Sequence, residues 1–350
     1  MVLSIADAFI RHQIYLERYK LGLDGHADEL FAALAISVPA VLAVAKVGRM
    51  GEMNKRSLTK LIAKVMKAHS RAYSSFTSKL IAELKKFAAT EAVVTTKIAE
   101  YVEHKPAEKA VEENQGTDWT FLLGLLALQP SPKGRARLWV TVANTPDAAT
   151  GMAPLQLLKR YGAYTAENFR RAMQQAYVNN WSISETIKVL FGTASKKHKD
   201  GLVHKLRQQG ASTLHTLVQH VSSRVQAGVA SLFFKFYEWV SVIDNGTTDI
   251  CRSRDASVYA YGKGPLPPAH YRCRSKAIPL AQGKKSVGVP NNFYDWLNTQ
   301  PVAVQNDLIG RTMAGKIRTG RVKPTKYTPK GALTLSQFAG KVSMMTKPAS

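Results

Sequence analysis

The sequence predicts an α+β protein in which a mainly helical N-terminal domain is followed by a mixed α/β domain with a small sheet and a basic C-terminal tail. Three observations support this class. Apolar residues recur at helical spacing in the first part of the chain, and a β-branched, alternating run at residues 237–243 predicts a strand. The chain after Asp307 has no acidic residue. At 350 residues the chain is long enough for two domains.

Residues 1–115 are expected to form a helical assembly domain. Ser4 and Asp7 resemble a capping box at the start of its first helix. Pro39 is expected to kink the second helix. The expected helices cover residues 4–20, 28–47, 54–67 and 71–104. Their Leu and aromatic stripes are typical of a core rather than of a binding surface, so this domain suits packing or assembly.

Residues 116–150 are expected to form a linker with a short helix and a strand. The expected order is a polar loop at residues 106–118, an apolar helix at 119–128, a basic turn at 130–137, a strand at 138–142 and a turn-rich segment at 144–151. The basic turn could touch phosphate, but an exposed, solvated loop is the simpler interpretation.

Residues 151–307 are expected to form the mixed domain. Ser182 and Glu185 predict a capped helix that ends at Gly192. The expected helices cover residues 155–161, 166–180, 184–191 and 212–235, with a basic cluster at 196–205. The expected strands cover residues 237–243 and 258–261, and an irregular loop follows at 262–268.

The charge of the chain restricts its partners. Forty-nine Lys and Arg residues against 24 Asp and Glu give a formal net charge of +25. Such a field predicts a polyanionic partner, most simply nucleic acid, with salt-dependent affinity. A basic surface that faces an acidic protein is the alternative. No signal peptide is predicted, and the most apolar windows are too short or too interrupted to span a bilayer. We therefore expect a soluble protein made in a reducing cytoplasm, with no membrane partner.

Chemistry-bearing residues gather in the segment that holds both cysteines, Cys251 and Cys273, with His270 between them. These three soft ligands could hold zinc, with Asp249, Asp255 or a water as the fourth ligand. A disulfide formed after exposure to an oxidising environment is a second interpretation. The third is two semi-buried thiols beside a histidine that is hydrogen-bonded to the backbone. Nothing marks an oxyanion hole, so we expect no catalytic cysteine and no catalytic residues.

A two-part motif surrounds the cysteines: WVSVIDNGTTDICRSRD and, after a gap, PPAHYRCRS. This motif resembles the phage Mu F-like head morphogenesis family, the minor head proteins of tailed bacteriophages. The matching residues are Trp239, Asp244, Thr247, Thr248, Cys251, Asp255, Pro267, Pro268, His270, Cys273 and Arg274. The resemblance covers about residues 150–340 and includes YDWLNTQPVAVQNDLIG downstream, together with Leu333 and Leu335.

The chain departs from the family pattern at three positions. Arg254 and Ser275 stand where some members have cysteines, so the four-cysteine zinc site of those members is ruled out here. Ala256 stands where the family usually has glycine, which bears on the tightness of that turn.

The resemblance implies a virion protein in several copies near the portal, with portal or coat protein as partners. It implies a role in head assembly, DNA packaging or DNA ejection, and no established enzymatic activity. The protein would pass through the host cytoplasm during assembly. An enzyme delivered in the virion, such as an ADP-ribosyltransferase or a nuclease, is the alternative, although no Glu-x-Glu pair or HNH-like cluster supports it. A host-encoded basic nucleic-acid protein is a third interpretation, and no groove-reading motif supports it.

Residues 308–350 form the basic tail, which is expected to be partly flexible. Its cations are interleaved with Gly, Thr and Pro, which suits contact with double-stranded DNA through the phosphates, without base reading. A solvated tail that packs on the portal or coat is the alternative. The expected DNA-binding residues are Arg311, Lys316, Arg318, Arg321, Lys323, Lys326 and Lys330.

Overall fold

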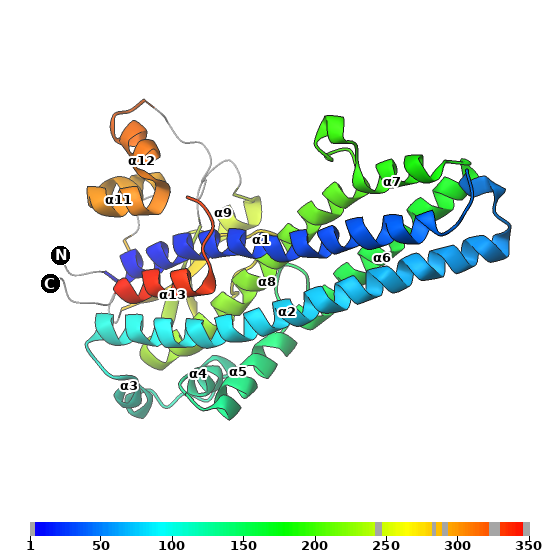
Figure 1. The fold of residues 1–350 in the computed structure, drawn as a ribbon. Helices are drawn as coiled ribbons and strands as arrows, with labels where there is room; N and C mark the ends of the chain where they lie inside the picture. Colours follow the sequence, from blue (N-terminus) through cyan, green and yellow to red (C-terminus); the bar gives the residue numbers. More distant parts are fainter. Residues whose placement is uncertain (1–3, 242–246, 282–284, 289–292, 322–329, 346–350) are drawn as a thin grey trace. The chain divides into compact units, whose positions relative to one another are not determined.

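The computed structural model describes the chain except for residues 1–3, 242–246, 282–284, 289–292, 322–329 and 346–350 (Figure 1). The chain is mainly helical, with one small three-stranded antiparallel sheet, and the predicted α+β class is confirmed. It forms two compact units, each built from segments distant in sequence. Unit 1 comprises Met1–Gly22, Leu84–Pro154 and His215–Ser350, and unit 2 comprises Leu23–Glu83 and Leu155–Leu214. The division of the sequence into four consecutive parts stays a prediction.

Four long helices replace helices that were expected to be shorter. They are α1 (Ile5–Ala43), α2 (Lys55–Glu103), α6 (Pro154–Val178) and α8 (Leu202–Phe233). The expected breaks within α1, α2 and α6 were wrong. Pro39 lies inside α1, so it does not end the helix. Gly22 also lies within α1, where a Cβ would clash with the backbone oxygen of Leu333. That glycine serves a close approach of two backbones and is not a helix stop.

The expected loop and strand between residues 106 and 142 were also wrong in part. The loop contains α3 (Ala107–Glu113), and the basic turn and the strand together form α5 (Pro132–Asn144). Ser131 caps α5 by accepting a hydrogen bond from the Gly134 amide, and Pro132 occupies the first helical turn, where proline is favoured. The expected apolar helix is confirmed as α4 (Trp119–Ala127), capped by Asp118.

The sheet of unit 1 has the strand order β2–β1–β3. The strands are β1 (Phe236–Val240), β2 (Val258–Ala260) and β3 (Lys276–Leu280), and the short helix α9 (Asp249–Arg254) lies between β1 and β2 in the chain. In this register Tyr237 pairs with Tyr259 on one side and with Pro279 on the other. Pro279 fits because β3 is an edge strand. The two expected strands are confirmed, and β3 was not foreseen.

The described residues of the C-terminal part of unit 1 include four short helices: α10 (Phe293–Thr299), α11 (Val302–Ile309), α12 (Arg311–Arg318) and α13 (Leu335–Met344). A capping box between Thr334 and Gln337 starts α13. In Figure 1 α13 lies beside the first turns of α1. Its Phe338 is fully buried, with its ring centroid 5.6 Å from Tyr19 and 5.8 Å from Phe87. The described end of the tail is therefore part of the core.

Unit 2 holds the second part of α1, the first part of α2, most of α6, the start of α8, and α7 (Ile183–Phe191). Two 3-10 turns, Met50–Glu52 and Ala194–Lys196, complete it. The Ser182–Glu185 capping box and the end of α7 at Gly192 are confirmed, and Gly192 has a φ of +81°. The hydroxyl of Tyr73 on α2 donates to the Leu158 carbonyl of α6, which fixes these two helices together.

Of the described helices, α1 is the one with the length and apolar composition that a membrane span requires, with a mean hydropathy of 1.4 over its most apolar window. A third of that window (33%) is buried in the protein. Core helices of soluble proteins meet the same criterion.

Candidate functional site

The site is built on β1 and on the two chain segments that follow it. Trp239 of β1 is fully buried, and its indole Nε1 donates to the Ser241 hydroxyl at 3.1 Å. The Arg254 guanidinium lies over the Trp239 ring at 5.2 Å from its centroid. Asp255 accepts a hydrogen bond from the Ser241 amide at 2.7 Å, which fastens the end of α9 to the end of β1. This framework places Cys251, inside α9, against the sheet.

The turn after α9 has a positive φ at a non-glycine residue. Ala256 has a φ of +60°, in the left-handed region that glycine favours, and its amide donates to the Trp239 carbonyl at 2.9 Å. The turn is therefore formed in spite of the alanine, at the cost of local strain.

The second segment brings His270 and Cys273 to the same place. The amide of Cys273 donates to the His270 carbonyl at 3.1 Å, which closes a tight turn. The turn is anchored on α8 because the Arg272 amide donates to the Thr216 hydroxyl at 3.1 Å. The Gln219 amide group also donates to the Ser275 carbonyl at 3.2 Å. These α8 partners carry no motif signal, and the sequence did not indicate them.

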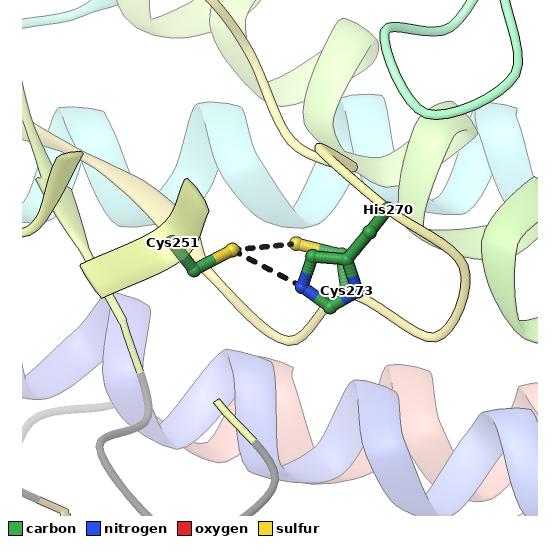
Figure 2. Close-up of side chains that lie close together, drawn as sticks. All are labelled: Cys251, His270 and Cys273. Carbon is green, nitrogen blue, oxygen red and sulfur yellow. Dashed lines mark hydrogen bonds between the residues drawn. The ribbon is translucent and has the colours of Figure 1, made fainter. Parts of the chain in front are cut away.

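Three ligand atoms converge at this point, as Figure 2 shows. The sulfurs of Cys251 and Cys273 lie 3.8 Å apart, and His270 Nε2 lies 3.1 Å from the Cys251 sulfur. All three atoms lie within 4.8 Å of one another. Both cysteines are buried and free, and the histidine is half-buried. A Cys251–Cys273 disulfide is therefore not formed in this structure.

The histidine is oriented by its other nitrogen. His270 Nδ1 lies 2.8 Å from the Tyr271 carbonyl oxygen, so Nδ1 carries the proton and donates to it. In the neutral ring Nε2 then carries the lone pair, and this atom faces the sulfurs. A backbone carbonyl that fixes the tautomer in this way is the usual partner of a metal-binding histidine.

The hydrogen bond between the two sulfurs shifts the pKa values of the two thiols in opposite directions. The hydrogen bond with Cys251 lowers the pKa of Cys273 well below its usual value, and His270 acts in the same direction. The same contact, with burial, raises the pKa of Cys251. The hydrogen bond with Cys273 also raises the pKa of His270. One thiolate is thus stabilised beside an imidazole in a buried place, which suits soft-metal binding.

Neither expected acidic ligand completes a zinc site. The Asp249 side chain is fully exposed, and Asp255 is engaged by the Ser241 amide. The buried hydroxyl of Thr248 lies beside Cys251 and lowers the pKa of that thiol by hydrogen bonding to it. The donor set that the structure brings together is therefore Cys₂His, and two sulfurs with one imidazole nitrogen fit a soft metal.

Of the other expected motif residues, Arg274 is half-buried in the same loop, and Asp244 lies outside the described residues. The downstream part of the motif docks elsewhere in unit 1. Trp296 Nε1 and the Gln300 amide both donate to the Asp7 carboxylate, at 2.9 and 3.0 Å. This segment therefore fastens α10 to the start of α1.

The tail cations lie in different environments. All five described cations are exposed, and two of them, Arg318 and Lys330, are also hydrogen-bonded within the protein. Arg318 donates to the Gln305 side chain at 2.8 Å, and Lys330 reaches the Asn306 carbonyl at 3.4 Å. Lys323 and Lys326 lie outside the described residues. Two of the expected phosphate contacts are therefore already engaged with α11.

A pocket of Arg, Glu and His around residues 259–261 would favour the alternative of an enzyme delivered in the virion. Tyr261 is instead buried against Tyr237, with ring centroids 5.0 Å apart. A cavity of about 410 Å³ in unit 1 is lined by other residues, among them Glu103, Lys105 and Phe234.

No protein-family model, curated protein or solved structure matches this chain.

Proposed function

We propose that the protein is a minor head protein of a tailed bacteriophage that acts as a structural component and not as an enzyme. The observation that supports this proposal is the convergence of the motif. Trp239, Cys251 and Cys273, separated along the chain, meet in one buried cluster, and the half-buried His270 lies beside the two sulfurs. The residues that carry the resemblance are therefore those that form one structural unit.

In this role the protein sits in the virion, near the portal, in several copies, after assembly in the host cytoplasm. Portal or coat protein is its protein partner, and double-stranded DNA is contacted through the phosphates without base reading. The net charge of +25 supports the DNA contact, because a cationic surface beside packed DNA gains affinity by releasing counterions. The role of the protein would be in head morphogenesis and in DNA packaging or ejection.

The test is a pull-down of the full-length chain with the portal protein of the same phage, in low and high salt and with or without DNA. Retention on the portal in high salt indicates a packed interface and supports the proposal. Loss of portal binding at every salt concentration contradicts it. DNA binding that does not weaken with salt contradicts the electrostatic part alone.

A second candidate property is soft-metal binding, most simply of zinc, at Cys251, His270 and Cys273. The specific observation is the 3.8 Å separation of the sulfurs. Two sulfurs bound to one tetrahedral zinc at bonds of about 2.3 Å lie about 3.8 Å apart. The site would hold the metal in a structural role, cross-linking α9 to the loop before β3.

The metal test uses the reduced full-length chain and Zn²⁺ alone. About one equivalent of zinc per chain is expected after dialysis, and Cys273→Ser and His270→Gln should each lose it. His198→Gln is the control because His198 is an exposed histidine of unit 2. Equal zinc retention by Cys273→Ser and by the control contradicts the site. Failure here leaves the head-protein proposal standing.

A further inference from the structure

The first half of α2 is the most one-sidedly charged helix segment of unit 2. Between Glu52 and Glu83 the sequence has no Asp or Glu. The same stretch carries a series of cations: Lys55, Arg56, Lys60, Lys64, Lys67, Arg71 and Lys79. A helix with solvated charges normally carries both signs, because opposite charges three or four residues apart stabilise it. The absence of acids here needs another reason.

Five of these cations lie on one face of α2. Their successive separations are four, four, three and four residues, which keeps them within about 80° of one another around the helix. We name this set the α2 cationic stripe: Arg56, Lys60, Lys64, Lys67 and Arg71. All five are exposed. The opposite face is buried, with Val65 fully enclosed and His69 bonded to Thr165 of α6 at 2.8 Å.

The next cation of α2 after the stripe has an acidic partner. Lys79, further along α2, forms an ion pair with Glu29 of α1 at 2.7 Å. Among the residues that the structure describes, no such ion pair is found for the five cations of the stripe. Five exposed charges in a row repel one another and gain nothing from the fold. Their arrangement is explained by a partner that brings negative charge.

A groove runs beside the stripe within unit 2. Its cavity volume is about 540 Å³, and Lys64, Lys67 and Arg71 line it from α2. Ala33, Ser37 and Val41 line it from α1. The α1 side has small side chains and no charge, so a phosphate chain can approach the cations closely without meeting a carboxylate.

We propose that the α2 cationic stripe and its groove bind the phosphate backbone of duplex DNA. The stripe offers about one cation per helical turn over about 22 Å of helix. B-DNA presents about a dozen phosphates over that length. This inference rests on the DNA contact of the proposed function, but it places that contact in unit 2 and not only in the C-terminal tail.

A lipid surface fits this place less well. A helix that binds a bilayer surface inserts Trp, Phe or Leu side chains beside its cations. The exposed α1 residues next to the groove are mostly alanines, with Ile36 as the large exception. The observations favour contact by charge at the surface of a polyanion, without insertion of apolar side chains.

The experiment measures binding of the full-length protein to a 30-base-pair duplex of random sequence by fluorescence anisotropy over a range of salt concentrations. Two triple variants are compared: Lys64→Gln with Lys67→Gln and Arg71→Gln in the stripe, and Arg311→Gln with Lys316→Gln and Arg321→Gln in the tail. Glutamine keeps the helix propensity of lysine and arginine, and circular dichroism verifies folding. A charge-matched pair on the same helix, Lys67→Gln against Lys79→Gln, separates an unpaired cation from an ion-paired one.

The stripe variant is expected to bind DNA roughly 10- to 100-fold more weakly at about 0.1 M salt, with a salt slope smaller by roughly two to three. Lys67→Gln should weaken binding more than Lys79→Gln does. DNA binding by the stripe variant equal to that of the wild type, with loss in the tail variant, overturns this inference and leaves the proposed DNA contact in place. Failure of the wild type to bind DNA overturns both this inference and the DNA contact of the proposed function.

The wild type and the stripe variant are also tested for binding to anionic vesicles of phosphatidylglycerol and phosphatidylcholine and to poly-glutamate. A stripe variant that loses binding to vesicles or to poly-glutamate while keeping DNA affinity overturns the inference in favour of a membrane or an acidic protein. A loss of affinity in the stripe variant that is confined to DNA, or is largest for DNA, supports the inference.

Discussion

The Nζ atom of Lys276 lies 3.2 Å from Nδ1 of His12, and Nε2 of the same imidazole lies 2.9 Å from a carboxylate oxygen of Glu91. Burial lowers the pKa of His12, so the ring is neutral. It can then accept from Lys276 on one side and donate to Glu91 on the other. All three side chains are buried, and they come from β3, α1 and α2. One imidazole thus ties the sheet of unit 1 to two of its helices.

Removal of the Glu91 charge should destabilise this network strongly. Burial lowers the pKa of Lys276 to about 7, so at pH 6 the ammonium is charged. Glu91→Gln removes the nearest counter-charge of Lys276, so the lysine must either stay charged with less compensation or give up its proton, and a loss of about 3–5 kcal/mol of unfolding free energy is expected. The measurement is denaturant unfolding at pH 6.

The control for this variant is Glu29→Gln, which breaks the exposed pair with Lys79. Exposed pairs contribute about 0–1 kcal/mol, so this change should be nearly neutral. Equal stability of the two variants would contradict the structural importance of the buried network.

Truncation of Phe338 tests whether the end of the tail belongs to the core. Its side chain is fully buried against Tyr19 and Phe87. Phe338→Ala should cost about 3–5 kcal/mol through lost burial and the cavity left behind. Met344→Ala in the same helix is the control, because Met344 is 65% exposed and its loss should change stability by less than about 0.5 kcal/mol. Thermal unfolding that is unchanged in Phe338→Ala would mean that α13 is not docked in solution.

Local signals in the sequence predicted the elements that have local causes. The Ser182–Glu185 box, the glycine at 192 and the alternating strand at β1 were all recognisable, because caps and side-chain alternation act over a few residues. Residues 138–142 were mistaken for a strand because a short apolar run has no decisive period. The cap at Ser131 was the signal that could have corrected this.

The sequence indicated which residues lie near one another in the site, but not their geometry. The sequence placed Cys251, His270 and Cys273 in one segment, but it left the zinc, disulfide and free-thiol interpretations open. Distances between sulfurs depend on the anchoring of the loop by α8, from residues such as Thr216 that carry no motif. The α2 cationic stripe is visible as a spacing pattern in the sequence, but its exposure follows only from which face of α2 packs on α6.

His69 should make the stability of the protein depend on pH. Burial lowers its pKa from 6.5 to about 4. Below pH 6.5 the unfolded chain binds a proton at this histidine and the folded chain does not, so stability falls as the pH decreases from 6.5 to 4. His69→Gln should reduce that slope by up to about 1.4 kcal/mol per pH unit. Urea unfolding at several pH values between 4 and 7 measures it.

The control for the pH series is His104→Asn, because His104 is exposed at the end of α2 and asparagine tolerates its positive φ. This change should leave the slope of the wild type intact. Parallel curves for His69→Gln and the wild type would show that His69 does not provide the pH dependence.

Ala256→Gly should stabilise the protein, although most substitutions by glycine destabilise. Ala256 has a φ of +60°, where a side chain clashes with the backbone and glycine does not. Relief of this strain outweighs the larger entropy that glycine has in the unfolded chain, so a gain of about 0.5–1 kcal/mol is expected. The matched control is Ala260→Gly in β2, where a loss of about 0.5–1 kcal/mol is expected because no strain is relieved. Thermal unfolding of both variants decides the point: a loss in Ala256→Gly as large as in Ala260→Gly would mean that this turn stores no strain.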